Sequence, residues 1–114
     1  MENDSHLYIL WTSGDPLTAM NMVMMYGGNS LRKGWWEKVT IIIWGAATHL
    51  VSSNAEVQKK IKELMGMGVF FTACKSCAKN LDAVDQLEAL GIEVKFWGEP
   101  LSDLLKSGAK LLTI

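Results

Sequence analysis

Five apolar runs with strand character recur along the 114-residue chain, and stretches with helical spacing separate them. The clearest run covers residues 38–44, where five successive β-branched residues favour a parallel strand that is covered on both faces. The full set of predicted strands is 7–12, 38–44, 69–73, 92–97 and 110–114. Alternating strands and helices predict an α/β fold, a parallel sheet with helices on both sides. The fourth run has mixed faces, which indicates a strand at the sheet edge.

The helical stretches carry their own start and stop signals. Asp15 can cap the first helix, and Pro16 suits its first position. Four methionines (Met20, Met22, Met24, Met25) follow on this helix, and their spread over several faces favours contact with a second copy. The glycine pair at residues 27–28 is expected to break or kink the helix.

The later helices are predicted in the same way. Ser53 with Glu56 matches a capping box for a helix that runs to about residue 65. After the third strand, apolar residues at positions 78, 81, 84, 87 and 90 predict one helix that ends before Gly91. Pro100 is expected to open a last short helix.

Composition excludes several classes of partner. A net charge of −1, from 11 basic and 12 acidic residues, gives no support for nucleic-acid binding. No apolar stretch reaches the ~18 residues needed to span a bilayer. Residues 1–6 are polar and unlike a signal peptide. We therefore predict a flexible segment at 1–6, a single domain at 7–114 and a cytoplasmic protein.

The only two cysteines, Cys74 and Cys77, lie close together. Cys74 is predicted where the third strand ends and a helix begins, and backbone N–H groups and the helix dipole favour an anion there. A thiol at such a site ionises more readily, and the thiolate is the reactive form. Lys75 can add a positive charge. Cys77 either approaches Cys74 closely enough for a disulfide or packs in the first helical turn and never meets it.

Further candidate residues lie after the other strands. Ligand sites of parallel α/β sheets lie beyond the carboxyl ends of the strands. Three segments, residues 13–15, 44–46 and 74–77, are expected there. His49, on the loop after the second strand, can act as a base or steer an anion. The candidate binding residues are Ser13, Gly14, Asp15, Trp44, Gly45, His49, Lys75 and Ser76.

Metals and cofactors are not expected. A zinc site needs about four ligands, and neither His6 nor His49 has ligand spacing to the cysteines. The chain also lacks the glycine patterns of dinucleotide-binding and phosphate-binding loops. The sequence therefore predicts no metal ion and no cofactor.

Several segments together resemble a known family. They are the strand ending in residues 12–16, the methionine-rich helix, the strand ending in residues 43–46, the path from Glu56 through Gly68 to Cys74, and the turn at residues 89–94. Over nearly all of residues 7–114 the order and spacing are similar to the DsrE/DsrF-like family, which includes small DsrE/TusD-type sulfur-relay proteins.

The resemblance implies a three-layer α/β/α fold with a five-stranded parallel sheet, usually assembled as trimers or hexamers. In sulfurtransferase members a cysteine after the third strand accepts sulfur as a persulfide and hands it to a partner protein, and Cys74 matches that position. The resemblance thus implies sulfur transfer through Cys74.

Two other functions stay open. Because Cys77 adds a second thiol close by, the pair can instead serve thiol–disulfide or peroxide redox chemistry. The chain can also be a non-catalytic oligomeric binding module in which the cysteines have no role. The sequence does not decide whether the protein is an enzyme, and it names neither a sulfur donor nor an acceptor.

Overall fold

A five-stranded, all-parallel sheet forms the centre of the computed structural model, which describes residues 2–114. The strands are β1 (His6–Trp11), β2 (Lys38–Ile43), β3 (Phe70–Cys74), β4 (Glu93–Lys95) and β5 (Lys110–Thr113). Their order is β4-β3-β2-β1-β5, so β2 is central and β4 lies at an edge. The predicted α/β fold, its five strands and the edge position of β4 are confirmed.

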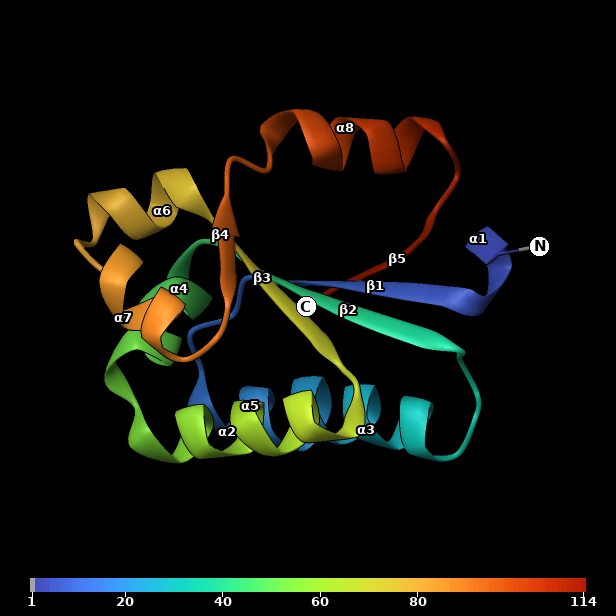
Figure 1. Cartoon of the computed structure of the whole chain (residues 1–114), viewed down its shortest axis with the longest axis horizontal. Coiled ribbons are helices and arrows are strands. Elements are labelled where there is room, and N and C mark those ends of the chain that lie inside the picture. Colours follow the sequence, from blue (N-terminus) through green and yellow to red (C-terminus); the bar gives the residue numbers. More distant parts are fainter. Residues whose placement is uncertain (1) are drawn as a thin grey trace.

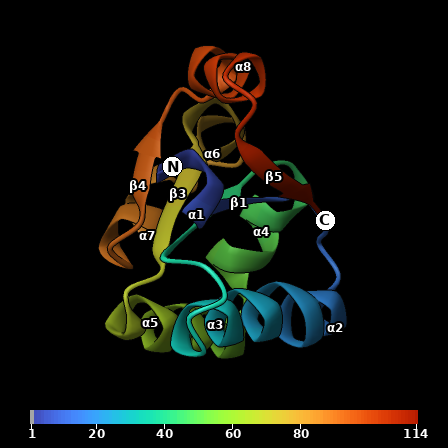
Figure 2. The ribbon, with the colours of Figure 1, turned by 90° about the vertical axis from the view of Figure 1, so that its right-hand side faces the viewer.

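Helices cover the two faces of the sheet unequally (Figures 1 and 2). The short α2 (Pro16–Thr18), the π-helical η1 (Ala19–Met24) and α3 (Met25–Arg32) form one almost continuous helix, which lies beside α5 (Ala55–Met67) on one face. Only α8 (Gly98–Lys106) lies over the middle of the other face. The remaining helices are α1 (Glu2–Ser5), α4 (Ala46–Ser53), α6 (Lys75–Asn80) and α7 (Val84–Ala89).

Alternating side chains of each strand divide the core in two. In β1, Leu7, Ile9 and Trp11 are buried against the α3–α5 face, where they join the larger apolar cluster. Tyr8 and Leu10 point to the α8 face and stay half-buried beside a smaller cluster. None of the α8 side chains is fully buried. The α8 face is therefore the thinly covered side of the sheet.

Three predicted helical features are wrong. The expected helix from residue 78 to 90 is two helices, α6 and α7, because the chain turns at Asp82, which has a positive φ of 53°. Residues 46–53, expected as a loop, form α4. As a result the cap of α5 is Asn54, whose side chain accepts a hydrogen bond from the Val57 N–H at 3.0 Å, and Ser53 instead donates to the His49 carbonyl.

The glycine pair Gly27 and Gly28 neither breaks nor kinks its helix, contrary to the prediction. Both glycines lie inside α3 and are buried, and the irregular segment is the π-helical η1 that precedes them.

The methionines of this helix differ in burial. Met24 belongs to the core, whereas Met22 and Met25 are 39% and 51% exposed.

Different effects are expected for alanine at the two glycines. A Cβ at position 28 would lie 3.5 Å from Leu64 Cγ, an ordinary contact, so Gly28→Ala should stabilise the protein by about 0.5–1 kcal/mol through helix propensity. A Cβ at position 27 would lie only 3.3 Å from Ile41 Cδ1, so Gly27→Ala should lose that gain. Urea unfolding of both variants measures the difference, and equal midpoints would contradict it.

The N-terminal residues extend the domain slightly. Glu2–Ser5 form one helical turn, and β1 begins at His6. Met1 lies outside the described residues, and the predicted flexibility of residues 1–6 stays a prediction. Within residues 2–114, no helix has both the length and the apolar character that a membrane span requires.

Candidate functional site

The carboxyl ends of β1, β2 and β3 bring the predicted segments together at one edge of the sheet. These strands end at Trp11, Ile43 and Cys74. The Trp44 N–H donates to the Trp11 carbonyl at 3.0 Å, and the Ala47 N–H donates to the Thr12 carbonyl at 3.2 Å. These bonds join the loop after β1 to the loop after β2, and the cysteines follow directly on β3.

Two glycines shape this rim. A Cβ at Gly14 would lie 3.1 Å from Ala46 Cβ, a tight contact, so a side chain there would push the two loops slightly apart. Gly45 has φ 59° and ψ −135°, a backbone conformation that other residues rarely adopt. In this conformation the Gly45 N–H donates to Cys77 Sγ at 3.4 Å. The rim therefore places a backbone donor directly against a cysteine sulfur.

Cys74 is the last residue of β3 and the N-cap of α6, as the sequence predicts. Its side chain points to the α8 face, where it belongs to the smaller apolar cluster with Ile42 and Trp97. Only 3% of Cys74 is exposed, so solvent barely reaches it. The helix behind it has only six residues.

Trp97 is part of the cluster around Cys74, and sequence reasoning did not assign it to the site. The indole is 5% exposed, and its Nε1–H donates to Thr72 Oγ1 at 2.7 Å. The Thr72 hydroxyl in turn donates to the Glu93 carboxylate at 2.9 Å. The Lys95 ammonium lies 4.6 Å from the Trp97 ring centroid. These contacts hold the indole in place beside the thiol.

Cys77 lies half-buried in the first turns of α6, beside Cys74. Burial raises the pKa of the Cys77 thiol, the Gly45 N–H lowers it, and the neighbouring Cys74 raises it through charge and a hydrogen bond. Cys77 also packs against the smaller apolar cluster that contains Cys74. Both thiols are free in this structure.

A pocket of ≈ 280 Å³ opens in front of Cys77. Gly45, Ala46 and His49 line it from the β2 loop and α4, and Asn80 and Leu81 line it from the end of α6. His49 therefore shares a pocket with Cys77, although it lies on a helix and not on the expected loop. Asn80 and Leu81 were not predicted, because their place here depends on where α6 ends.

The other predicted residues have local structural roles. Asp15 caps α2 by accepting from the Thr18 N–H at 2.9 Å and its hydroxyl at 2.8 Å, and these bonds lower the pKa of its carboxyl group. Ser13 Oγ accepts from the Asp15 N–H at 3.2 Å. The Lys75 ammonium lies 5.4 Å from the Phe96 ring centroid. Trp44 packs on the smaller cluster, and Ser76 is exposed.

Several solved structures are similar to this chain, and three of them are BT1422, MTH1491 and YchN. BT1422 of Bacteroides thetaiotaomicron, a conserved protein of unknown function, is 39% identical over 100% of this chain and 98% of its own, with a TM-score of 0.97. MTH1491 of Methanobacterium thermoautotrophicum, also of unknown function, is 16% identical over 96% of this chain and 97% of its own, with a TM-score of 0.74. YchN of E. coli is 13% identical over 96% and 98%, with a TM-score of 0.68. Neither a family model nor a curated protein matches.

Proposed function

We propose that this chain, which belongs to the same family as BT1422 and to the YchN/DsrE-like structural group, is a sulfur-handling protein that carries a persulfide sulfur on its cysteine pair. The observation that carries the proposal is the arrangement of the two thiols. Cys77 faces a pocket, and Cys74 lies buried beside it at the carboxyl end of β3. Cys74 also holds the position at which the DsrE/DsrF-like resemblance expects the sulfur acceptor.

The chemistry needs no cofactor. A cysteine thiolate attacks the outer sulfur of a donor persulfide, R–S–SH. The S–S bond of the donor breaks, the donor leaves as a thiolate, and the protein gains a persulfide. Because Cys77 faces the pocket, it meets the donor first, and Cys74 can then take the outer sulfur by the same attack. A thiol of a partner protein removes the sulfur in the last step.

One backbone donor supports the anionic sulfur at Cys77. Burial raises the pKa of Cys77, and the Gly45 N–H, which bonds Cys77 Sγ, offsets part of that rise by favouring the charged form of the thiol. The apolar surroundings of Cys74 exclude water, which protects a persulfide from competing reactions. Donor and acceptor are proposed to be proteins or small thiols that reach the pocket in front of Cys77.

Intact mass spectrometry after incubation with glutathione persulfide tests the proposal. The wild type should gain one sulfur atom, and peptide mapping should locate it on Cys74. Cys74→Ser should hold the sulfur on Cys77, and Cys77→Ser should load Cys74 more slowly because the pocket-facing thiol is gone. The double serine variant is the control. No sulfur gain in the wild type, or equal gain in the double variant, would overturn the proposal.

Dithiol redox chemistry is the second candidate, and the adjacency of the two sulfurs favours it. In this reaction a peroxide takes two electrons and two protons from the thiols and is reduced to water, or to water and an alcohol. A Cys74–Cys77 disulfide forms. The same mass measurement distinguishes the candidates, since oxidation removes two hydrogen atoms and adds no sulfur.

We also propose that the chain works as a homo-oligomer, a trimer or a hexamer. Large apolar side chains are exposed on or next to the thinly covered α8 face: Phe70 is 49%, Phe96 58% and Leu105 59% exposed. A second copy that covers them would remove this apolar surface from water. Sedimentation equilibrium at micromolar concentration should give a multiple of the 12.6 kDa chain mass, and a monomer would refute the assembly.

A further inference from the structure

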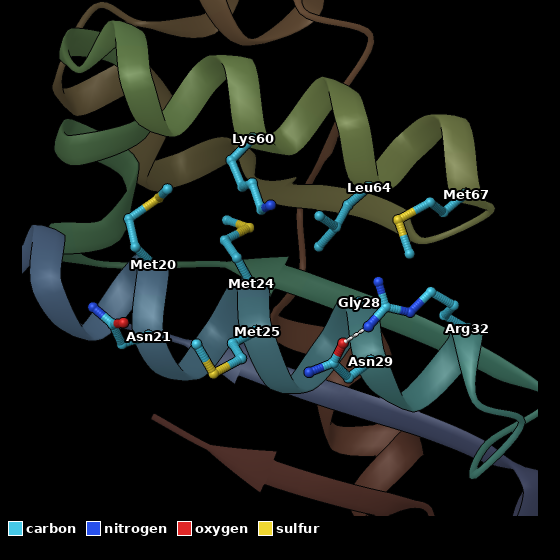
Figure 3. Close-up of a pocket in the computed structure, with 10 residues that line it drawn as sticks. All are labelled: Met20, Asn21, Met24, Met25, Gly28, Asn29, Arg32, Lys60, Leu64 and Met67. Atoms are coloured by element: carbon cyan, nitrogen blue, oxygen red, sulfur yellow. Dashed lines mark hydrogen bonds between the residues drawn. The ribbon is translucent and has the colours of Figure 1, made fainter.

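We propose a second binding site, separate from the cysteines, in the groove between the η1–α3 helix and α5. The groove has a volume of ≈ 380 Å³, within the roughly 300–1,000 Å³ of small-molecule sites. Its ligand is a small amphipathic anion, an apolar chain that ends in a carboxylate or a phosphate. Figure 3 shows the residues that line it. We name it the methionine groove.

The shape of the methionine groove follows from the spacing of residues on the two helices. Met20, Met24, Gly28 and Arg32 follow at four-residue steps and form one wall. Lys60, Leu64 and Met67 form the facing wall on α5. Gly28 has no side chain and lies opposite Leu64, so the two helices approach closely at this point of the groove. Both walls belong to helices of the folded domain, the π-helical η1 with α3 on one side and α5 on the other, so the site is preformed.

Apolar thioethers make up much of the groove surface. Met24 is buried at its base, and Met67, which is 41% exposed, lies at its rim (Figure 3). Methionine side chains are flexible and polarizable, so they adapt to apolar chains of different shape. This part of the groove fits the apolar body of a ligand, and Asn21 is the polar side chain beside it.

Two cations line the groove at different points, Lys60 beside Met24 and Arg32 at the end near Met67 (Figure 3). Lys60 on α5 and Arg32 on α3 extend into the space between the helices from opposite walls (Figure 3). Lys60 pairs with Glu63 at 3.3 Å, but the pair is exposed, and such pairs contribute about 0–1 kcal/mol. Arg32 donates one N–H to the neutral side chain of Asn29, which leaves further donors for a ligand. Both cations can therefore turn to an anion at little cost.

The charges also decide against other ligands. None of the ten lining residues is acidic, and the two cations repel a metal ion that thioethers would otherwise attract. Two carboxylates lie outside this lining: Glu63 pairs with Lys60, and Glu56 lines an adjoining hollow at the Met20 end. An anionic head group is thus favoured at either cation, Lys60 or Arg32, with the apolar chain along the neighbouring thioethers.

Isothermal titration with sodium decanoate and decyl phosphate tests the site. Both should bind, and decanol and decyltrimethylammonium should not. Arg32→Gln and Lys60→Gln should each weaken binding about tenfold, because a hydrogen bond to a charged group is lost. Lys62→Gln, an exposed lysine on the same helix, is the matched control and should bind like the wild type. The tighter of the two anions identifies the head group as carboxylate or phosphate.

Several results would refute the site: no binding of either anion, equal binding of decanol, or equal loss in the Lys62 control. Circular dichroism confirms that each variant is folded. The double cysteine variant should bind the anions unchanged, because Cys74 points to the opposite face of the sheet. Failure of this site therefore leaves the sulfur proposal untouched, and the reverse also holds.

Discussion

Replacing Trp97 by alanine should lower the free energy of unfolding by about 3–5 kcal/mol, the usual loss for a buried aromatic side chain. The indole is almost fully buried, and its removal leaves a cavity beside Cys74 and Ile42. It also removes the hydrogen bond from Nε1 to Thr72. Urea unfolding followed by circular dichroism measures the loss.

The same variant should expose the buried thiol. With the indole gone, Cys74 should react with iodoacetamide in the folded protein, which wild-type Cys74 resists. Trp97→Phe keeps most of the packing and should cost less, because Thr72 retains Glu93 as a partner. Trp35→Ala is the control, since Trp35 is 57% exposed and its loss should change stability little. Unchanged protection of Cys74 in a folded Trp97→Ala variant would show that the indole does not shield the thiol.

Cys77 should be labelled by iodoacetamide roughly a hundredfold faster than Cys74 in the native wild type. Labelling of Cys74 requires a local opening, and an opening that costs about 2.7 kcal/mol gives this ratio. Because the pKa of Cys77 is raised, its labelling rate should keep rising with pH beyond the range of an ordinary thiol. Mass spectrometry of the labelled peptides gives both rates.

Gly45→Ala tests the contribution of the backbone donor. The substitution strains a conformation with φ 59° and displaces the N–H that holds down the pKa of Cys77. Labelling at neutral pH should fall about tenfold for one unit of further increase in pKa. Gly34→Ala is the matched control, because Gly34 also has a positive φ, of 73°, but lies far from the cysteines in the sequence, and a Cβ there would meet no atom within 4 Å. Equal labelling rates of the two variants would show that the Gly45 N–H does not tune the pKa of Cys77.

The strands and the position of Cys74 could be predicted from the sequence, because β-branched runs and the turn into a helix are local signals. The burial of Cys74 could not be predicted, since it depends on Trp97, which arrives from beyond β4. The break at Asp82 was missed because the apolar spacing of residues 78–90 continues through it. The bond between Gly45 and Cys77 joins residues 32 positions apart, and no local pattern reports it.

The pairing of β5 with β1 has a consequence for the order of synthesis. Leu7 pairs with Lys110, so the first strand to leave the ribosome acquires one of its neighbours last. Until then one edge of β1 presents unpaired N–H and C=O groups, which invite pairing with another chain. Contacts this distant in sequence also carry a large loop-closure entropy, so they slow folding. During translation the nascent domain is therefore most vulnerable to aggregation along the outer edge of β1.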